Sequence, residues 1–335
     1  MIRRNRVAAL VGAALAVLLV ACTPEIPEVS PDPEETEAQP VLDVPRLERV
    51  LADIEEHINA ADEESDGDIL AERMEDPALA VRTAEYRLRS ATADTDDETG
   101  LQPLTTSSAV SIVAATEEWP RAVFVITEIP DEANSPLLIG LRQETPQEPY
   151  RMFSWVRLLP GVTTPQTDVA EIGSTPVDPA DDSFLTSPQQ ALENYADLLT
   201  EGEDSEFADD FAEEPFRELV EQEAQTLSEN VEAAGEFTHD TAVREDDTVA
   251  MLTADGGVVV IGAMRTRHTF TKTEDDGEVE VGGQLAALSE DDGEVNESLR
   301  GTYHVMVALY VPTEQEDAQI TVLGVERVLA DVSEE

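Results

Sequence analysis

The sequence predicts an α+β protein with two domains, each built of helices followed by a curved antiparallel sheet. Apolar residues recur at helical spacing at the start of 46–162 and again at the start of 187–332, and runs of alternating apolar and polar residues follow in both segments. Residues 163–186 contain three prolines and no sustained period, which is typical of a linker. We therefore expect one α+β domain at 46–162 and a second at 187–332.

The N-terminus has the features of a secretory signal peptide. Arginines at positions 3, 4 and 6 precede an apolar run over 7–20. This run is shorter than the roughly 20 apolar residues that a transmembrane helix needs. We therefore expect residues 1–21 to direct export and to be removed.

The segment Leu19-Val20-Ala21-Cys22 resembles the lipobox of bacterial lipoproteins. The resemblance implies that a diacylglyceryl group alkylates the Cys22 thiol and that cleavage makes Cys22 the first mature residue. A thiol is a strong nucleophile, small neighbours leave it accessible, and two acyl chains give a stable anchor. The alternative is an ordinary secretory peptide in which Cys22 has no role. Because Cys22 is the only cysteine, no disulfide can form within the chain.

Residues 22–45 predict a disordered tether, because six prolines lie there among acidic residues. A segment of this composition is extended and repels itself. From residue 46 the pattern changes to a single apolar helical face, formed by Leu47, Val50, Leu51, Ile54 and Ile58.

The remainder of the first domain is rich in strand patterns. Residues 79–88 are ambiguous between helix and strand, and the strands that follow favour a strand. Alternation of apolar and polar residues then predicts strands at 109–115, 121–129, 137–143 and 150–159.

The second domain opens with the residues of a helix start. Ser187 is placed to cap the helix, Pro188 occupies the first turn, and Gln190 stands at the capping-box position. A short helix near Phe207–Phe211 and a longer one from Pro215 to Gly235 come next. Strands are then predicted at 237–243, 248–253, 258–272, 278–281, 302–311 and 319–329.

The charge of the chain limits its partners. The chain holds 74 acidic and 20 basic residues, a formal net charge of −54. Nucleic acid is excluded as a partner, because phosphate binding needs a basic face. Lys272 is the only lysine, and acid enrichment with few lysines is typical of proteins exposed to concentrated salt. We expect a halophilic source; an acidic secreted protein without salt adaptation is the alternative.

Two resemblances rest on particular segments. The order of helices and strands in 187–332 resembles the cone-shaped α+β fold of nuclear transport factor and scytalone dehydratase, which implies helices over a curved sheet that can enclose a pocket. Glu118-Trp119-Pro120-Arg121, the run Pro149–Gly161 and Asn194-Tyr195-Ala196-Asp197 resemble a group of uncharacterised actinobacterial lipoproteins. This second resemblance implies attachment to the outer face of the cytoplasmic membrane, and it implies no catalytic residue.

Four residues on predicted strands are candidates for ligand binding. Arg265 and Arg267 share one face of the longest predicted strand, His268 lies on its other face, and His304 lies on a later strand. Two guanidinium groups on a curved sheet could bind an anionic ligand; the alternative is internal pairing with carboxylates. His239, His268 and His304 could also converge on zinc, but their spacing is generic, so we predict no metal site.

Trp155 is a fifth candidate. It shares a strand face with Arg151, Phe153 and Arg157. Aromatic rings flanked by guanidinium groups can make cation–π contacts at a pocket or a protein interface. Core packing, with the arginines reaching outward, is the alternative.

The chain carries no recognisable catalytic signature, since Gly-x-Ser-x-Gly, Ser-x-x-Lys and a phosphate-binding glycine loop are absent from the sequence. We therefore expect a non-enzymatic, lipid-anchored, extracytoplasmic envelope protein without a cofactor, whose partner is another envelope component. One alternative is a small-ligand carrier or sensor with a pocket in the C-terminal domain. A further alternative is a hydrolase or isomerase that uses the same pocket.

The charge pattern predicts that salt stabilises the fold. Raising KCl from about 0.1 M to about 2 M should raise the melting temperature, since the Debye length falls well below about 10 Å and carboxylates then repel one another less. Thermal melts followed by circular dichroism measure this change. A melting temperature that stays constant or falls would contradict the halophilic expectation.

Overall fold

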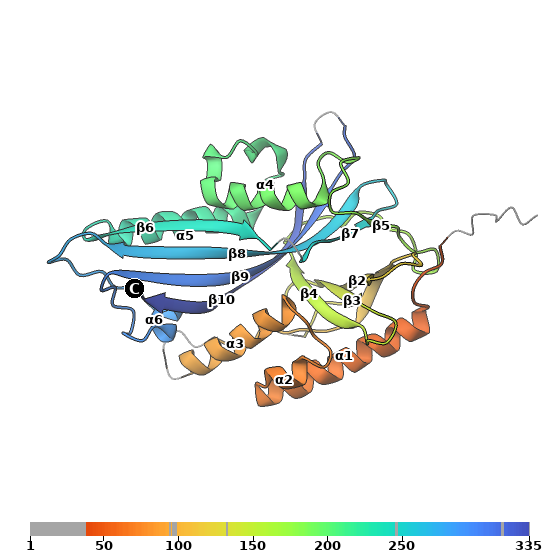
Figure 1. The fold of residues 1–335 in the computed structure, drawn as a ribbon, viewed down its shortest axis with the longest axis horizontal. Coiled ribbons are helices and arrows are strands. Elements are labelled where there is room, and N and C mark those ends of the chain that lie inside the picture. The colour runs from red at the N-terminus through yellow and green to blue at the C-terminus, as the bar shows by residue number, and fades with distance from the viewer. Residues whose placement is uncertain are drawn as a thin grey trace, which may run out of the picture. The chain divides into compact units, whose positions relative to one another are not determined.

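The computed structural model confirms the α+β prediction: its described residues form six α-helices and ten β-strands (Figure 1). The described residues are 38–93, 95, 99–131, 133–244, 247–315 and 318–334. The predicted signal peptide, Cys22 and the predicted tether up to residue 37 lie outside them.

The first half of the described chain places helices before strands, as predicted. Its helices are α1 (Val44–Glu64), α2 (Gly67–Leu70) and α3 (Ala78–Thr92). Its strands are β1 (Ser108–Val113), β2 (Arg121–Thr127), β3 (Leu137–Gln143) and β4 (Arg151–Leu158).

The second half repeats this order with longer strands. After β5 (Pro176–Val177) come α4 (Pro188–Glu201), two short 3₁₀ helices (Gly202–Asp204 and Ala208–Asp210) and α5 (Pro215–Val231). The strands are β6 (Gly235–Val243), β7 (Val249–Leu252), β8 (Val258–Lys272), β9 (Ser298–Val311) and β10 (Thr321–Glu334), with α6 (Gly283–Leu288) between β8 and β9.

All ten strands belong to one antiparallel sheet. The strand order is β1-β2-β3-β4-β10-β9-β8-β7-β5, and β6 pairs with the C-terminal half of β8. The prediction of two domains with separate sheets is therefore wrong. β10 pairs with β4 through Gly324 with Leu158 and Val325 with Arg157, and this short ladder joins the two meanders.

Gly324 makes this junction possible. A Cβ atom at position 324 would lie 2.5 Å from the Arg157 carbonyl oxygen and 2.8 Å from a methyl carbon of Val156. Only glycine allows so close an approach of two backbones. Beside it, the N–H of Leu159 donates to the carbonyl of Leu323 over 2.9 Å. Pairing between strands so far apart in the sequence leaves no periodic signal, which explains the wrong prediction.

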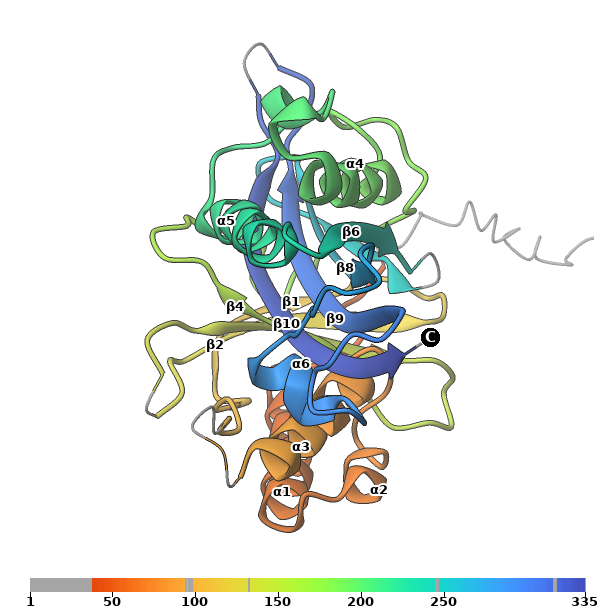
Figure 2. The ribbon, with the colours of Figure 1, turned by 90° about the vertical axis from the view of Figure 1, so that its left-hand side faces the viewer.

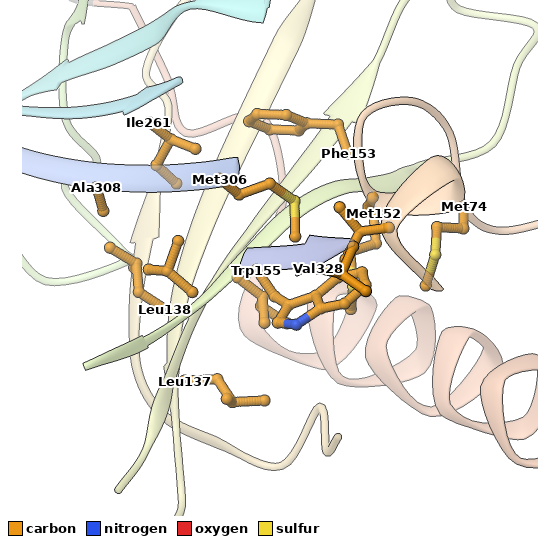
Figure 3. Packing of buried hydrophobic residues seen from close by; sticks show 14 of the residues in the cluster. Met74, Leu137, Leu138, Met152, Phe153, Trp155, Ile261, Met306, Ala308 and Val328 are labelled. Carbon is orange, nitrogen blue, oxygen red and sulfur yellow. The ribbon is translucent and has the colours of Figure 1, made fainter. Parts of the chain in front are cut away.

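Helices cover both faces of the long-stranded part of the sheet. α4 and α5 lie over one face, and α3 and α6 lie over the other (Figures 1 and 2). A core cluster on the α3 side mixes residues of both halves, because Trp155 of β4 packs near Met306 of β9 and Val328 of β10 (Figure 3). A second cluster lies between α4 and the sheet, and α4 contributes Leu192 and Tyr195 to it. The shared first cluster is a second reason why the halves do not form separate domains.

Residues 79–88 form part of α3, so the strand predicted there is wrong. The buried face of α3 includes Val81, Arg82, Glu85 and Leu88. Because two of these buried residues are charged, the helical period does not appear as an apolar period in the sequence.

The folded part begins before residue 46. The N–H of Val41 donates to the carbonyl of Ala114 over 2.9 Å, and the Asp43 side chain accepts from the N–H of Arg46. Pro45 lies in the first turn of α1, where a missing N–H costs nothing. Residues 163–186, which the sequence assigns to a linker, supply β5 to the sheet.

The predicted strand at 278–281 is also wrong. Within this segment Glu280 forms an isolated bridge with Glu294 instead of a strand. A helix, α6, follows directly. The Asp276-Gly277 turn signal is therefore local and does not set up a hairpin.

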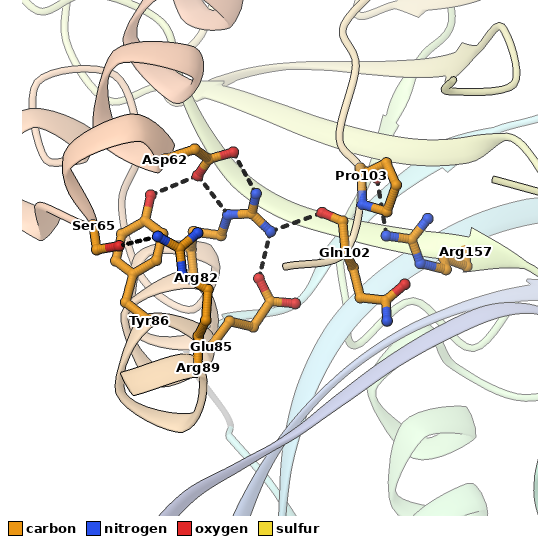
Figure 4. Close-up of polar contacts among 9 residues, drawn as sticks. All are labelled: Asp62, Ser65, Arg82, Glu85, Tyr86, Arg89, Gln102, Pro103 and Arg157. Carbon is orange, nitrogen blue, oxygen red and sulfur yellow. Dashed lines mark hydrogen bonds and ion pairs between the residues drawn. The ribbon is translucent and has the colours of Figure 1, made fainter. Parts of the chain in front are cut away.

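A buried ionic network fastens α1 and α3 beside the junction (Figure 4). The guanidinium of Arg82, 1% exposed, bonds to the carboxylates of Asp62 and Glu85 and donates to the Gln102 carbonyl over 2.9 Å. All three guanidinium nitrogens donate hydrogen bonds, which offsets the cost of burying the charge. Nearby, Arg157 lies 3.4 Å from Glu326 of β10, and burial raises the pKa of Glu326 to about 7.

The junction predicts a specific weak point. Gly324→Ala should lower the free energy of unfolding by about 1–3 kcal/mol, because the new methyl group meets backbone that cannot move on its own. Denaturation followed by circular dichroism measures the loss. Gly282→Ala is the matched control, since a Cβ at Gly282 meets no atom within 4 Å. Equal losses in the two variants would show that the junction tolerates a side chain.

Candidate functional site

The candidate site is a groove beside the first strand of the sheet. A cavity of about 670 Å³ lies between α1, β1 and the loop 167–171. We call it the β1 groove. Its lining consists of α1 residues between 44 and 55, residues 106–111, Glu128 and the loop itself. The volume falls within the range of roughly 300–1,000 Å³ that is typical of binding sites.

Local interactions hold the two long walls of the groove together. Leu47 and Leu51 of α1 are buried against the sheet, which turns the neighbouring residues of the helix toward the groove. Thr106, just before β1, donates to the Leu51 carbonyl over 2.8 Å and bonds to the Glu55 carboxylate over 3.0 Å. The helix and the start of the strand are therefore fixed relative to each other.

The floor of the groove is an open strand edge. β1 is the terminal strand of the sheet, and in the part of the chain that the structure describes no strand pairs with the outer edge of Ser108–Ile112. Further along, Ser174 closes this edge by donating its N–H to the Val113 carbonyl and accepting from the Ala115 N–H, both over 2.8 Å.

The hydrogen-bonding groups of Ser111 face this open edge. The Ala114 N–H donates inward to the Ala122 carbonyl of the β2 side, whereas the Val113 carbonyl points outward to Ser174. Because N–H and C=O groups alternate between the two edges of a strand, those of Ser111 point outward like those of Val113. An unpaired edge of this kind can pair with another chain.

Exposed apolar side chains gather around the groove. Val44, Val110 and Val169 line it and are 39%, 45% and 58% exposed. Ile172, 62% exposed, follows in the chain two residues after the lining residue Ala170. By contrast, Leu219 is a large exposed hydrophobic side chain that lies on α5 and does not line the groove. A concentration of this kind marks a contact surface more often than single exposed residues do.

The polar part of the lining is acidic. Glu48, Glu55, Glu128, Asp168 and Glu171 line the cavity, and no lysine, arginine or histidine does. Within the described residues, none of these five carboxylates takes part in a salt bridge. The groove therefore combines an apolar wall, unpaired backbone groups and negative charge that no internal cation neutralises.

The serines of the groove have no arrangement for nucleophilic attack. The hydroxyls of Ser108 and Ser111 bond to each other over 2.8 Å. A serine nucleophile needs a base that takes its proton, and these two hydroxyls face each other instead.

Three smaller cavities accompany the groove. One of about 390 Å³ adjoins it and shares Val44, Ala170 and Glu171. One of about 460 Å³ lies between the end of α4 and α5 and is mainly acidic, and one of about 300 Å³ lies beside the segments 159–163 and 212–215.

The sequence candidates of the second half do not form one site. Arg265 pairs across the sheet with His304, so these two side chains share a face with Arg267, whereas His268 faces the opposite side. Arg267 lies 3.1 Å from Asp240, as the internal-pairing alternative proposes. None of these side chains lines the β1 groove or the three smaller cavities described above.

His268 lies in an aromatic cluster. Its ring centroid is 4.7 Å from that of Tyr303 and 5.3 Å from that of Phe237. Burial lowers the pKa of His268 to about 3, with a further contribution from Arg327. His304 lies on the other face, so it cannot join His239 and His268, and the described residues contain no group of side chains that could hold a metal ion.

The structure describes the position of Trp155 but not that of Cys22. Trp155 is 0% exposed and lies in the core, where the core-packing alternative places it (Figure 3). Cys22 lies outside the described residues. No helix among the described residues is long and apolar enough to cross a membrane.

Sequence reasoning missed the β1 groove because its parts are scattered. Val44, Val110 and Val169 lie on a helix, a strand and a loop far apart in the chain. One signal was available: the segment Ser107–Ser111 carries three serines at the start of the first strand of a meander, and a polar first strand is typical of a sheet edge.

The burial of His268 predicts a pH dependence. In the unfolded chain His268 binds a proton below a pKa of about 6.5, whereas the folded chain binds it only near 3. Stability is therefore lost as the pH falls below about 6.5, by up to about 1.4 kcal/mol per pH unit. His268→Phe should show a smaller loss over this range in urea denaturation at several pH values. If the two proteins lose the same free energy of unfolding over this pH range, the burial of a neutral His268 is not the cause of the pH dependence.

Comparison with known proteins defines the family of the chain. Neither the curated proteins nor the solved structures give a match, so the resemblances to actinobacterial lipoproteins and to the cone-shaped fold stay predictions. A family model described as a domain of unknown function, DUF8094, matches residues 38–332. This match starts with the first described residue and covers most of the chain, and the chain therefore belongs to the DUF8094 family.

Proposed function

We propose that the chain is a lipid-anchored protein on the outer face of the cytoplasmic membrane, whose folded part binds another component of the cell envelope and catalyses no reaction. The observation that carries the binding role is the β1 groove, in which an open strand edge, exposed apolar side chains and carboxylates without a salt bridge lie together.

The anchor rests on the sequence. Arg3, Arg4 and Arg6, the apolar run and Cys22 follow the order of a lipoprotein signal. Two acyl chains on Cys22 would bury enough methylene groups for a stable attachment. The acidic, proline-rich segment after Cys22 would then hold the folded part away from a membrane of like charge.

The binding role rests on what the groove offers. The wall of α1 and the loop 167–171 present apolar surface, and the edge of β1 presents backbone donors and acceptors. A small ligand would use the walls but leave the strand edge unpaired. A polypeptide uses both, which favours a protein partner over the small-ligand alternative.

The anchor predicts the location of the chain. In the native host, wild-type protein should sediment with membranes, and Cys22→Ala should appear folded in the soluble extracytoplasmic fraction. Immunoblots of the two fractions measure this distribution, and the circular dichroism spectrum of the released variant reports its folding. Retention of folded Cys22→Ala in the membrane fraction would contradict the lipid anchor.

The binding role predicts a reproducible partner. Chemical cross-linking in intact cells, followed by capture of the chain and mass spectrometry, should recover the same envelope protein from independent cultures. Stabilisation of the purified chain by a metabolite, without any recovered partner, would favour the small-ligand alternative instead.

A further inference from the structure

We propose that the β1 groove takes up an extended segment of the partner, rich in arginine or lysine, as an additional strand of the sheet. This inference rests on the proposed function and names the chemistry of its partner. Strand addition to an open edge supplies affinity through main-chain hydrogen bonds, and the side chains supply specificity.

The backbone of β1 defines where the added strand lies. Ser111 directs its N–H and C=O to the open edge, and Ser174 closes the same edge at Val113 and Ala115. The added strand therefore ends before Val113 and runs along Ser108–Ile112. At about 3.3 Å per residue, this stretch accommodates about five residues of the partner.

The loop after the groove leaves this space free. The N–H groups of Ile172 and Gly173 both donate to the Val169 carbonyl, over 2.9 and 3.0 Å. The two donors are thereby used within the loop, and the chain bonds to the edge of β1 only from Ser174 onward. Val169, whose carbonyl accepts both bonds, lines the groove beside β1, and its side chain is 58% exposed.

The apolar wall fits every second side chain of an added strand. Side chains of a strand alternate between the two faces of its sheet, and one set would lie against Val44, Val110 and Val169. These side chains are partly exposed in the described structure. Their burial by apolar side chains of the partner would add to the main-chain bonds.

Charge selects a basic partner and disfavours two other occupants. Five carboxylates line the groove and no basic residue does, so arginine or lysine on the added strand would find partners along the rim. A second copy of this chain would bring a formal net charge of −54 to the contact. Residues 23–37 of the chain itself hold six carboxylates and no basic residue, so they would be repelled as well.

The test uses a peptide probe. A blocked hexapeptide of alternating arginine and valine, carrying a fluorophore, is titrated with the full-length chain purified in detergent, and anisotropy reports binding. The peptide should bind, and salt should weaken its binding. The same peptide with alternate N-methylated amides, and a peptide with glutamate in place of arginine, should each bind at least about tenfold more weakly, since they lose main-chain bonds or charge complementarity.

Variants of the chain locate the site. Val169→Ser removes part of the apolar wall, and Ser111→Pro removes an outward N–H without breaking the pairing of β1 with β2. Each should weaken binding about tenfold or more. Leu219→Ser is the matched control, because Leu219 is 51% exposed but lies on α5. Circular dichroism melts of each variant confirm that the fold is retained.

The outcomes separate this inference from the proposed function. Equal binding by the wild type, Val169→Ser and Ser111→Pro, or undiminished binding of the N-methylated peptide, would overturn strand addition at β1. If the partner cross-links equally to the wild type and to Val169→Ser, the binding role stands but the groove assignment fails. If Val169→Ser abolishes a homodimer seen by sedimentation, a second copy of the chain is the occupant and the basic partner is wrong.

Discussion

The pairing of β4 with β10 is the constraint on which the rest of this structure depends. Two pairs of residues, centred on Gly324, join a four-stranded meander to the long strands of the second half. Without this ladder β4 and β10 would each be left with an unpaired edge. With it, Trp155 of β4 is buried among residues of β9 and β10, and the sheet runs without a break from β1 to β5.

The junction also positions the candidate site. It leaves β1 at the outer end of the sheet, where Ser174 bonds to the outer edge at Val113 and Ala115 and, within the described residues, no strand pairs with the stretch Ser108–Ile112. The network around Arg82 holds α3 to the last turn of α1 through Asp62, and α1 forms the apolar wall of the groove. A stable ionic network in the interior thus supports an open edge at the surface.

Local chemistry was predictable from the sequence, and long-range pairing was not. The cap at Ser187 and the bounds of β8 follow from signals within a few residues, and the structure confirms both. α3 was mistaken for a strand because Arg82 and Glu85 occupy its buried face. The single sheet depends on Gly324, whose role becomes visible only when β4 and β10 are side by side. The groove was missed for the same reason, since its walls come from three distant segments.

The most direct test of this account is differential scanning calorimetry of the full-length chain. If the β4–β10 junction makes the folded part a single cooperative unit, heating gives one transition whose calorimetric and van't Hoff enthalpies agree. Two resolved transitions, or a calorimetric enthalpy about twice the van't Hoff value, would show that the halves unfold independently and would contradict the central role of the junction.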